Sequence, residues 1–323
     1  MASLLCSLFN FILGLLLAPF LMGIIIRVKS KVSGRTGKPL LQPYYDLAKL
    51  IKKEPVYPAT TTWVFTLGPV ITAGATIAAL AFVPVGGTSS LVHFSGDIFV
   101  LLGFFALTRL AIMLSALDTG SAFEGMGTAR EALFSALVEP VFMLFMGVFA
   151  YYTKSLSLSA MIGGVTLDAW GSAWPFFLLL SIALYFIMLT ENARIPVDDP
   201  TTHLELTMIH EVMILDHSGP ELALYEYAAA LKLWIFGLIF AGLIVPLAEP
   251  SLFLADGSFA NGFFPVMLNI GATILSVFFM VFLVGITEST MARLRLERVP
   301  QLISLAGVFV ALAGLSVWRL YGL

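Results

Sequence analysis

The polar segment 191–219 carries most of the side chains in this sequence that could do chemistry. It reads ENARIPVDDPTTHLELTMIHEVMILDHSG and holds six of the chain's 20 acidic residues and three of its four histidines. The acids are Glu191, Asp198, Asp199, Glu205, Glu211 and Asp216, and the histidines are His203, His210 and His217. Carboxylates and imidazoles at this density can bind a metal ion, or they can take up and release protons.

The spacing of the three histidines argues against a shared metal ion. They recur at intervals of seven residues, which on a helix places neighbours about 10.5 Å apart. One metal ion binds histidine nitrogens at about 2.0–2.1 Å, and no second histidine follows His210 at the zincin spacing. The pattern favours a ladder of titratable groups, and the alternative is a surface helix that docks a partner through charge. We expect a helix from Thr202 to Leu215, folded back against the rest of the chain.

The elements that must position this segment are membrane-spanning helices. Hydrophobic residues make up 59% of the 323 residues and charged residues 11%, against about 45–50% and about 25% in a soluble domain. Eight stretches are apolar enough and long enough to span a bilayer: 4–26, 62–84, 97–117, 132–153, 172–193, 222–247, 263–287 and 301–320. The sequence therefore predicts an all-α membrane protein, with one polytopic domain of about eight transmembrane helices over residues 1–323.

Basic residues predict the orientation of these helices. Thirteen lysines and arginines fall in or beside the odd-numbered loops, and two fall on the opposite side. The positive-inside rule then puts the basic loop 27–60 and the acidic or inward-folded loop 191–221 at the cytoplasmic face of the cytoplasmic (inner) membrane, with both termini outside. Within the first loop, Pro43 to Lys53 has the period of an amphipathic surface helix, which could anchor on anionic lipid or dock a cytoplasmic partner.

Four ionisable residues fall inside the expected spans, namely Arg109, Glu139, Glu226 and Lys232. Each costs roughly 2.5–3.5 kcal/mol at a helix centre unless it finds a partner. Arg109 and Glu139 lie at similar depths on antiparallel neighbours, so we expect them to meet, whereas Glu226 and Lys232 lie six residues apart on different faces. The alternatives for these charges are ion pairs that fix helix register and a proton relay.

Three further residues complete the reading from residue types. Glu131 opens the fourth expected helix, where an acid suits the helix dipole. Glu288 ends the seventh and is either buried or interfacial. Cys6 is the chain's single cysteine, which excludes a disulfide framework and a thiolate-bound iron–sulfur site. We therefore expect no cofactor and no metal in this chain, and any redox centre in another subunit.

Six motifs, spread over nearly the whole chain, resemble those of a known protein family. They are KPLLQPYYDLAKLIKKE, LDTGSAFEGMGTARE, LVEP, ENARIPVDDPTTHLELTMIHE, DHSGPELALYEY and ESTMARLRLERVP. The chain resembles the membrane subunit shared by respiratory complex I, the NADH dehydrogenase subunit 1 family, and the energy-converting [NiFe] hydrogenases. It looks most similar to the formate hydrogenlyase and hydrogenase-4 branch. Where the quinone-reducing branch carries three glutamates, this chain has Thr201, His203 and Glu205.

The resemblance implies a non-catalytic coupling subunit in the lipid bilayer. It would dock a hydrogenase small subunit with iron–sulfur clusters and a large subunit with the NiFe centre, and would link them to antiporter-like membrane subunits that move H⁺ or Na⁺. The implied relay residues are Glu139, Glu191, Glu205, Glu211, Glu226, Arg194, Arg109 and Lys232. The implied docking residues are Asp198, Asp199, Asp118, Glu124, Arg130, Tyr44, Asp46 and Lys49.

Within this reading Arg194 would hold one of the relay acids, and Asp198 with Asp199 would lie nearest the redox arm. The alternative functions are the quinone-pocket subunit of an NADH:quinone oxidoreductase and a passive assembly anchor. No nucleic-acid partner is expected.

Overall fold

The computed structural model describes residues 2–198, 208–246 and 260–321. Within these ranges eight helices are long and apolar enough to cross a membrane. They are α1 (Ala2–Val32), α3 (Trp63–Leu80), α4 (Asp97–Asp118), α5 (Ala122–Thr153), α7 (Leu167–Glu191), α9 (Gly219–Ile244), α10 (Ala260–Thr290) and α11 (Val299–Tyr321). The expected all-α membrane fold with eight spans is confirmed.

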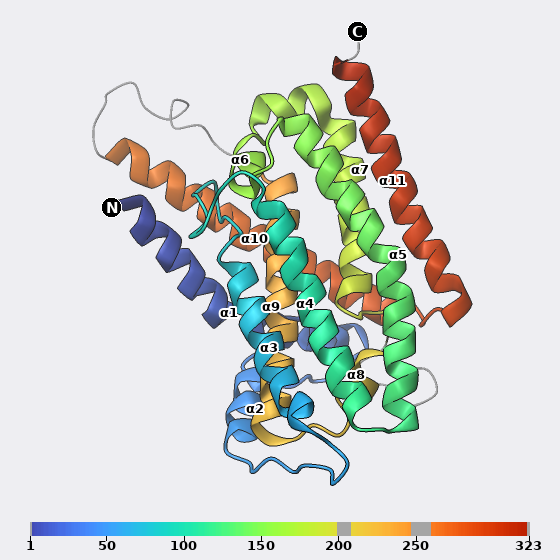
Figure 1. Ribbon diagram of the computed structural model, residues 1–323. Helices are drawn as coiled ribbons and strands as arrows, with labels where there is room; N and C mark the ends of the chain where they lie inside the picture. Colours follow the sequence, from blue (N-terminus) through green and yellow to red (C-terminus); the bar gives the residue numbers. More distant parts are fainter. Residues whose placement is uncertain (1, 199–207, 247–259, 322–323) are drawn as a thin grey trace.

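Four short helical elements lie between the spans. They are α2 (Gln42–Ile51), α6 (Leu158–Gly163), α8 (His210–Met213) and the 3-10 turn η2 (Leu296–Arg298). In Figure 1, α2 and α8 lie together at one end of the bundle, whereas α6 lies at the opposite end, near the C-terminus. The basic loop and the acidic segment are therefore brought to the same end of the molecule. The helix expected over Pro43 to Lys53 is present as α2, and none of its residues is fully buried.

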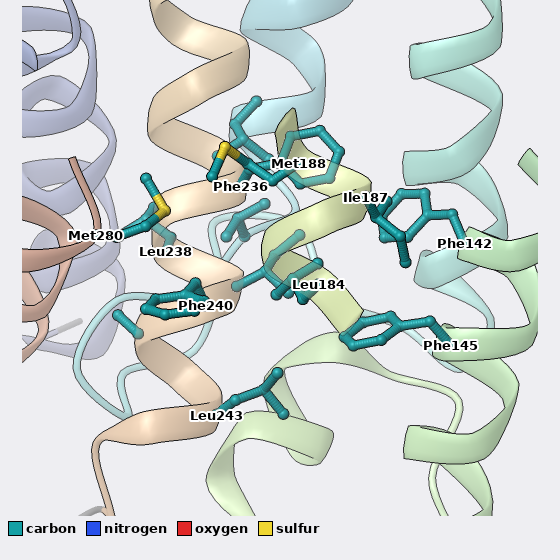
Figure 2. Packing of buried hydrophobic residues seen from close by; sticks show 14 of the residues in the cluster. Phe142, Phe145, Leu184, Ile187, Met188, Phe236, Leu238, Phe240, Leu243 and Met280 are labelled. Carbon is teal, nitrogen blue, oxygen red and sulfur yellow. The ribbon is translucent and has the colours of Figure 1, made fainter. Parts of the chain in front are cut away.

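Helix α9 is the centre of the bundle. It packs against α1, α2, α3, α7 and α10, and it is the most buried of the eight spans. The reason is its sequence, since LWIFGLIFAGLI after Lys232 is apolar on every face, and a helix of this kind must be covered all round. Figure 2 shows Phe236, Leu238, Phe240 and Leu243 of α9 packed with side chains of α5, α7 and α10.

Local signals explain where individual helices begin and bend. The side chain of Thr166 accepts a hydrogen bond from the Ala169 amide at the start of α7, as expected of an N-cap residue. The same helix leaves helical backbone angles at Ala173, two residues before Pro175. Proline lacks the amide that the helix needs and its ring crowds the preceding turn, so a kink at this position is expected.

Two of the differences from the expected boundaries affect the polar residues. Helix α5 begins at Ala122 instead of residue 132, so Arg130 and Glu131 lie inside it. In the segment expected to be helical from Thr202 to Leu215, the described helix is α8 alone. The predictions for Asp199, Thr201, His203 and Glu205 concern residues outside the described ranges.

Side chains from distant elements explain why α8 is short. The Asp198 carboxylate accepts hydrogen bonds from the amides of Ile209 (2.9 Å) and His210 (3.1 Å). On the other side of α8, the Glu124 carboxylate accepts one from the Asp216 amide at 3.2 Å. Backbone amides held by these tertiary contacts do not need a continuing helix to satisfy them.

Candidate functional site

Glu191, at the C-terminal end of α7, is the carboxylate on which the membrane charges converge. Its side chain is 2% exposed. Lys232 of α9 reaches Oε2 at 2.9 Å and also donates to the Glu191 carbonyl oxygen at 2.6 Å. Arg109 of α4 reaches Oε1 at 3.4 Å. One buried carboxylate therefore joins three helices.

Arg109 also holds a second carboxylate. Its Nη1 lies 2.9 Å from Oε1 of Glu139 on α5, so the pair expected from helix depth is confirmed. Helix α5 begins at Ala122, so Glu139 lies about 25 Å along the helix from its start. We call Arg109, Glu139, Glu191 and Lys232 the inner charge cluster.

Glu139 differs from the other three members in its exposure. Its side chain is 39% exposed, whereas that of Arg109 is 6% exposed. A carboxylate near the middle of a membrane span cannot face lipid cheaply, since an ionisable group at a helix centre costs roughly 2.5–3.5 kcal/mol. The exposed edge of Glu139 therefore marks a position where this subunit needs a polar neighbour.

Lys232 and Glu226 do not share an ion pair in the structure. Lys232 points to Glu191 across the bundle, and Glu226 is exposed on α9. Their separation by six residues predicted this divergence. Glu226 instead faces Asp46 of α2, whose charge acts on it.

A second group of charges surrounds Glu288 at the end of α10. Glu288 is 6% exposed, which decides between the buried and interfacial alternatives. Lys29 of α1 lies 2.9 Å from its carboxylate and Arg194 lies 3.4 Å away. The expectation that Arg194 would hold one of the relay acids stays a prediction, since the structure pairs Arg194 with Glu288 and also places its charge near Glu211.

The residues expected to dock a redox arm fall into two groups. Asp198 and Glu124 are 1% and 0% exposed. Asp198 binds Arg293 at 3.0 Å besides capping α8, and Glu124 is bonded to Thr119 and to the Asp216 amide. Their docking role stays a prediction, but it cannot act through exposed carboxylates.

The other described docking residues lie nearer the surface. Asp118 accepts hydrogen bonds from the amides of Thr62 (2.6 Å) and Phe65 (3.2 Å) at the start of α3. Arg130 donates to the Met208 carbonyl oxygen at 2.9 Å. On α2, the Tyr44 hydroxyl is bonded to α1, Asp46 accepts from Gln42 at 2.8 Å, and Lys49 is exposed. Most of these residues make hydrogen bonds at the end of the molecule that carries α2 and α8, and Lys49 is exposed there.

Three adjoining cavities lie beside these charges. The outer cavity, of about 300 Å³, lies between α1, α2, α9 and described residues of the ranges 192–198 and 210–214. Its lining mixes apolar side chains with Lys29, Asp46, Arg194, Asp198, His210, Glu211, Glu226 and Glu288. The middle cavity, of about 60 Å³, shares Arg194 and His210 with it and is also lined by Arg109, Glu191, Tyr225 and Lys232. The inner cavity, of about 10 Å³, is lined by Arg109, Ser135, Thr190 and Glu191, and such a volume holds about one water molecule.

Glu131 is a site residue that the sequence reading missed. It lines both the middle and the inner cavity, beside Glu191. The sequence reading assigned it to the helix dipole because the fourth span was taken to begin at residue 132. Its spacing of eight from Glu139 places both on one face of a helix, about two turns apart, and that signal could have identified it.

Burial shifts the pKa values of two neighbouring groups on α8 in opposite directions. Burial raises the pKa of Glu211 to about 7, helped by the charges of Glu226 and Asp198. Burial lowers the pKa of His210 to about 4, helped by Lys232 and Arg194. Glu211 can therefore exchange a proton near neutral pH, whereas His210 is neutral there.

The arrangement as a whole can move positive charge from the outer cavity to the inner charge cluster. Glu211 and Glu226 can take up protons in the outer cavity, and the middle cavity has room for water next to Glu191 and Lys232. A proton on Glu191 would weaken its hold on Lys232 and leave Arg109 to Glu139 alone. Carboxylates and lysines in this setting are the usual material of proton relays in membrane proteins.

Comparison with known proteins agrees with this architecture. The family model described as NADH dehydrogenase matches residues 5–318. Formate hydrogenlyase subunit 4 of Escherichia coli (strain K12) is 29% identical over 301 residues, which are 93% of this chain and 94% of that protein. Hydrogenase-4 component C of the same organism is 30% identical over 280 residues, 86% of this chain and 84% of that protein.

A solved structure shares the fold. A chain from the membrane-bound sulfane sulfur reductase, an archaeal respiratory membrane complex, matches with a TM-score of 0.76 and 20% sequence identity, covering 98% of this chain and 100% of that one. At 20% identity this likeness supports the fold alone. The two Escherichia coli relatives match this chain in sequence, over most of their own length and of this chain.

Proposed function

This chain belongs to the NADH dehydrogenase subunit 1-like family of membrane proteins, and from that premise we propose that it is the ion-coupling subunit of a hydrogenase-type redox complex. Its relatives are membrane subunits of hydrogenase-like and complex-I-like complexes. In the proposal, a redox arm that carries the iron–sulfur and NiFe centres docks at the end formed by α2 and α8, at the cytoplasmic face of the inner membrane. Electron transfer in that arm is coupled to ion movement through the inner charge cluster.

The observation that carries the proposal is the placing of Glu191. A buried carboxylate held by two cations from different helices lies beside cavities that adjoin the outer cavity under α2 and α8. An ion pair that served register alone would gain from tight packing without cavities, because each buried ion has already lost its hydration. A site that exchanges protons needs water within reach, and this one has room for it.

In the proposal, Arg109 passes the change in charge from Glu191 to Glu139, at the exposed edge of the subunit. It is shared between Glu191 and Glu139, at 3.4 and 2.9 Å, so a change of protonation at one carboxylate alters the charge felt at the other. Glu139 is the exposed end of this pair. An antiporter-like membrane subunit packed against α5 would cover it and would receive the change, and proton movement fits these groups better than Na⁺ movement because the cluster contains fixed cations.

The experiment is Glu191→Gln in the whole complex, with ion translocation into membrane vesicles and electron-transfer turnover measured on the same sample. We expect translocation to fall to background while the complex still assembles. Asp168→Asn, an exposed acid at the start of α7 on the other side of the bundle, is the matched control and should behave as wild type.

A second variant guards against simple misfolding. Glu191→Gln leaves Lys232 without its carboxylate partner, so the double variant Glu191→Gln with Lys232→Met removes both charges and should assemble at least as well as the single one. Wild-type translocation in either variant would leave the passive assembly anchor as the better description.

The outer cavity favours one other candidate function, the quinone-pocket subunit of an NADH:quinone oxidoreductase. Its volume of about 300 Å³ is at the lower end of small-molecule sites, at roughly 300–1,000 Å³, and its lining includes apolar side chains of α1, α2 and α9 beside the charged groups. A photoreactive quinone analogue that labels peptides of α1 or α9 in the native complex, and is displaced by excess quinone, would decide for this alternative.

A further inference from the structure

We propose that Glu221, His217, Ser115 and Tyr225 form a second proton route to the inner charge cluster, separate from the outer cavity. The inference rests on the proposed function, because a route for protons matters only if Glu191 exchanges them. It assigns a role to the DHSG turn before α9, which the relay described above does not use.

His217 is the centre of the route, with one hydrogen-bond partner on each ring nitrogen. Its Nδ1 lies 3.2 Å from Oε2 of Glu221, and its Nε2 lies 3.0 Å from Oγ of Ser115. The Phe65 ring stacks on the imidazole at a centroid distance of 3.8 Å, and Tyr225 meets it edge-on at 4.9 Å. An imidazole held in this way can take a proton on one nitrogen and release one from the other.

The outer end of the route reaches solvent through Glu221. The Glu221 side chain is 11% exposed, whereas that of His217 is 1% exposed. The Tyr57 hydroxyl lies within hydrogen-bonding reach of the same carboxylate, and Tyr57 is 50% exposed. Protons can therefore reach Glu221 from the loop between α2 and α3, without passing the residues of the outer cavity.

The inner end of the route is the hydroxyl of Tyr225. This residue is 1% exposed, and its hydroxyl lies within hydrogen-bonding reach of the Ser115 hydroxyl. Tyr225 lines the middle cavity together with Glu191 and Lys232. A water molecule in this cavity, of about 60 Å³, can form a further hydrogen bond with the Tyr225 hydroxyl.

Gly68 keeps the gap between Ser115 and Tyr225 open. A methyl group added at Gly68 would lie 2.8 Å from Oγ of Ser115 and 2.7 Å from the Tyr225 hydroxyl. Both hydroxyls therefore face the same side of α3, at a position where that helix carries no side chain. The closeness of the two groups supplies the step from His217 to the middle cavity.

The hydrogen-bond directions define the proton step. Ser115 donates to the Phe65 carbonyl oxygen at 3.1 Å, so it accepts from Nε2–H of His217, and Nδ1 faces Glu221 as an acceptor. Glu221 gives its proton to Nδ1, Nε2 gives its proton to Oγ of Ser115, and the Ser115 hydroxyl turns to pass its own proton to Tyr225 or to a water beside it. One proton moves inward, no electron is transferred, and a return of the imidazole to its first tautomer resets the route.

The same three side chains have the order of a serine hydrolase triad, but they cannot act as one. Ser115 is 0% exposed and lies under Phe65, which is also 0% exposed. A nucleophile needs room for a substrate carbonyl about 3 Å from its oxygen, and packing here leaves none. Proton transfer needs no such room.

Tyr225→Phe and Ser115→Ala test the route in vesicles that contain the complete complex. Each variant removes one hydroxyl and keeps the surrounding shape, so assembly should be unchanged. The initial rate of proton uptake during electron-transfer turnover is followed with a pH-sensitive dye, in H₂O and in D₂O. Ser181→Ala is the matched control, because Ser181 is a buried serine of α7 that donates to the Phe177 carbonyl oxygen at 2.7 Å and lies outside the route.

We expect proton uptake to slow by about tenfold in both variants, with a larger solvent isotope effect, because one positioned proton-transfer group commonly contributes roughly 10²–10⁴-fold and the outer cavity remains as a parallel path. The control should match wild type. If Glu191→Gln abolishes uptake while Tyr225→Phe and Ser115→Ala leave it unchanged, this route is overturned and the proposed function stands. If Glu191→Gln also leaves uptake unchanged, the proposed function fails, and turnover that moves Na⁺ without protons overturns the route as well.

Discussion

The two halves of the helix bundle differ sharply although the same helices build both. In the half near α2 and α8, helices α4, α5, α7 and α9 carry the inner charge cluster, and the three cavities adjoin it. In the other half, shown in Figure 2, the same α5, α7 and α9 present Phe142, Phe145, Leu184, Ile187 and Phe236 to one another. Phe236 stacks on Phe105 at 5.3 Å and also contacts Phe142 at 5.3 Å.

In the proposed function, this difference makes the bundle accessible to protons in the charged half and seals it against them in the apolar half. In that function, the charged half takes up protons from one end only, because aromatic and aliphatic side chains fill the continuation of the same path. Protons that reach Glu191 therefore leave sideways, through Arg109 and the half-exposed Glu139, or return. The subunit is a half-channel in this interpretation, and its partner across α5 completes the path.

The largest expected effect comes from removing one cation of the charged half. Lys232→Met leaves Glu191 with Arg109 alone, and breaking a buried ion pair in this way costs about 3–5 kcal/mol. We expect a matching fall in the thermal unfolding midpoint of the purified complex. Adding Glu191→Gln should recover part of the loss, since the two side chains are in contact, and strictly additive losses would show that the pair contributes little.

A smaller loss is expected in the apolar half, together with a different symptom. Leu184 is 0% exposed, and Leu184→Ala should cost about 3 kcal/mol through lost packing and a cavity. If this half is the seal, the passive proton conductance of vesicles should rise in the variant. Leu178→Ala, on the same helix but 46% exposed, is the control, and equal conductance in both variants would remove the seal from the interpretation.

The smallest expected effect is a change in pH dependence at α8. The pKa of Glu211 is raised to about 7 from 4.5, so its contribution to stability is fully present below pH 4.5 and is lost as pH rises through 7. Glu211→Gln should therefore be more stable than wild type at pH 8, by about 1–2 kcal/mol after allowance for solvent screening. Denaturation of the complex at pH 5 and pH 8 measures the difference.

His210 supplies an internal contrast for that experiment. Its pKa is lowered to about 4, so its contribution is present above pH 6.5 and is lost as pH falls through 4. His210→Gln should flatten the acid side of the stability profile, and Glu211→Gln the neutral to alkaline side. The exposed acid Glu297 is the control, and equal profiles for Glu211→Gln and Glu297→Gln would contradict the prediction.

Prediction from the sequence succeeded where depth alone decides. Arg109 and Glu139 were expected to meet because they lie at similar depths on antiparallel neighbours, and they are 2.9 Å apart. Prediction failed where a tertiary contact competes with a local pattern. The sequence places Glu131 at a helix start, whereas α5 begins at Ala122 and tertiary packing sets Glu131 beside Glu191 at two cavities.

The sequence is enough to predict the eight spans, the family and the concentration of acids in the segment 191–219, because hydropathy and composition are properties of the linear chain. It is not sufficient for the partners of those acids. Whether Glu191 receives Lys232, or Glu288 receives Lys29, depends on how each helix is rotated and packed, and an error of one residue turns a side chain by about 100°. Ion pairs form only within about 4 Å, so the tertiary structure alone decides which carboxylates are held by cations, which lie beside cavities, and which, like Glu139, keep an exposed edge.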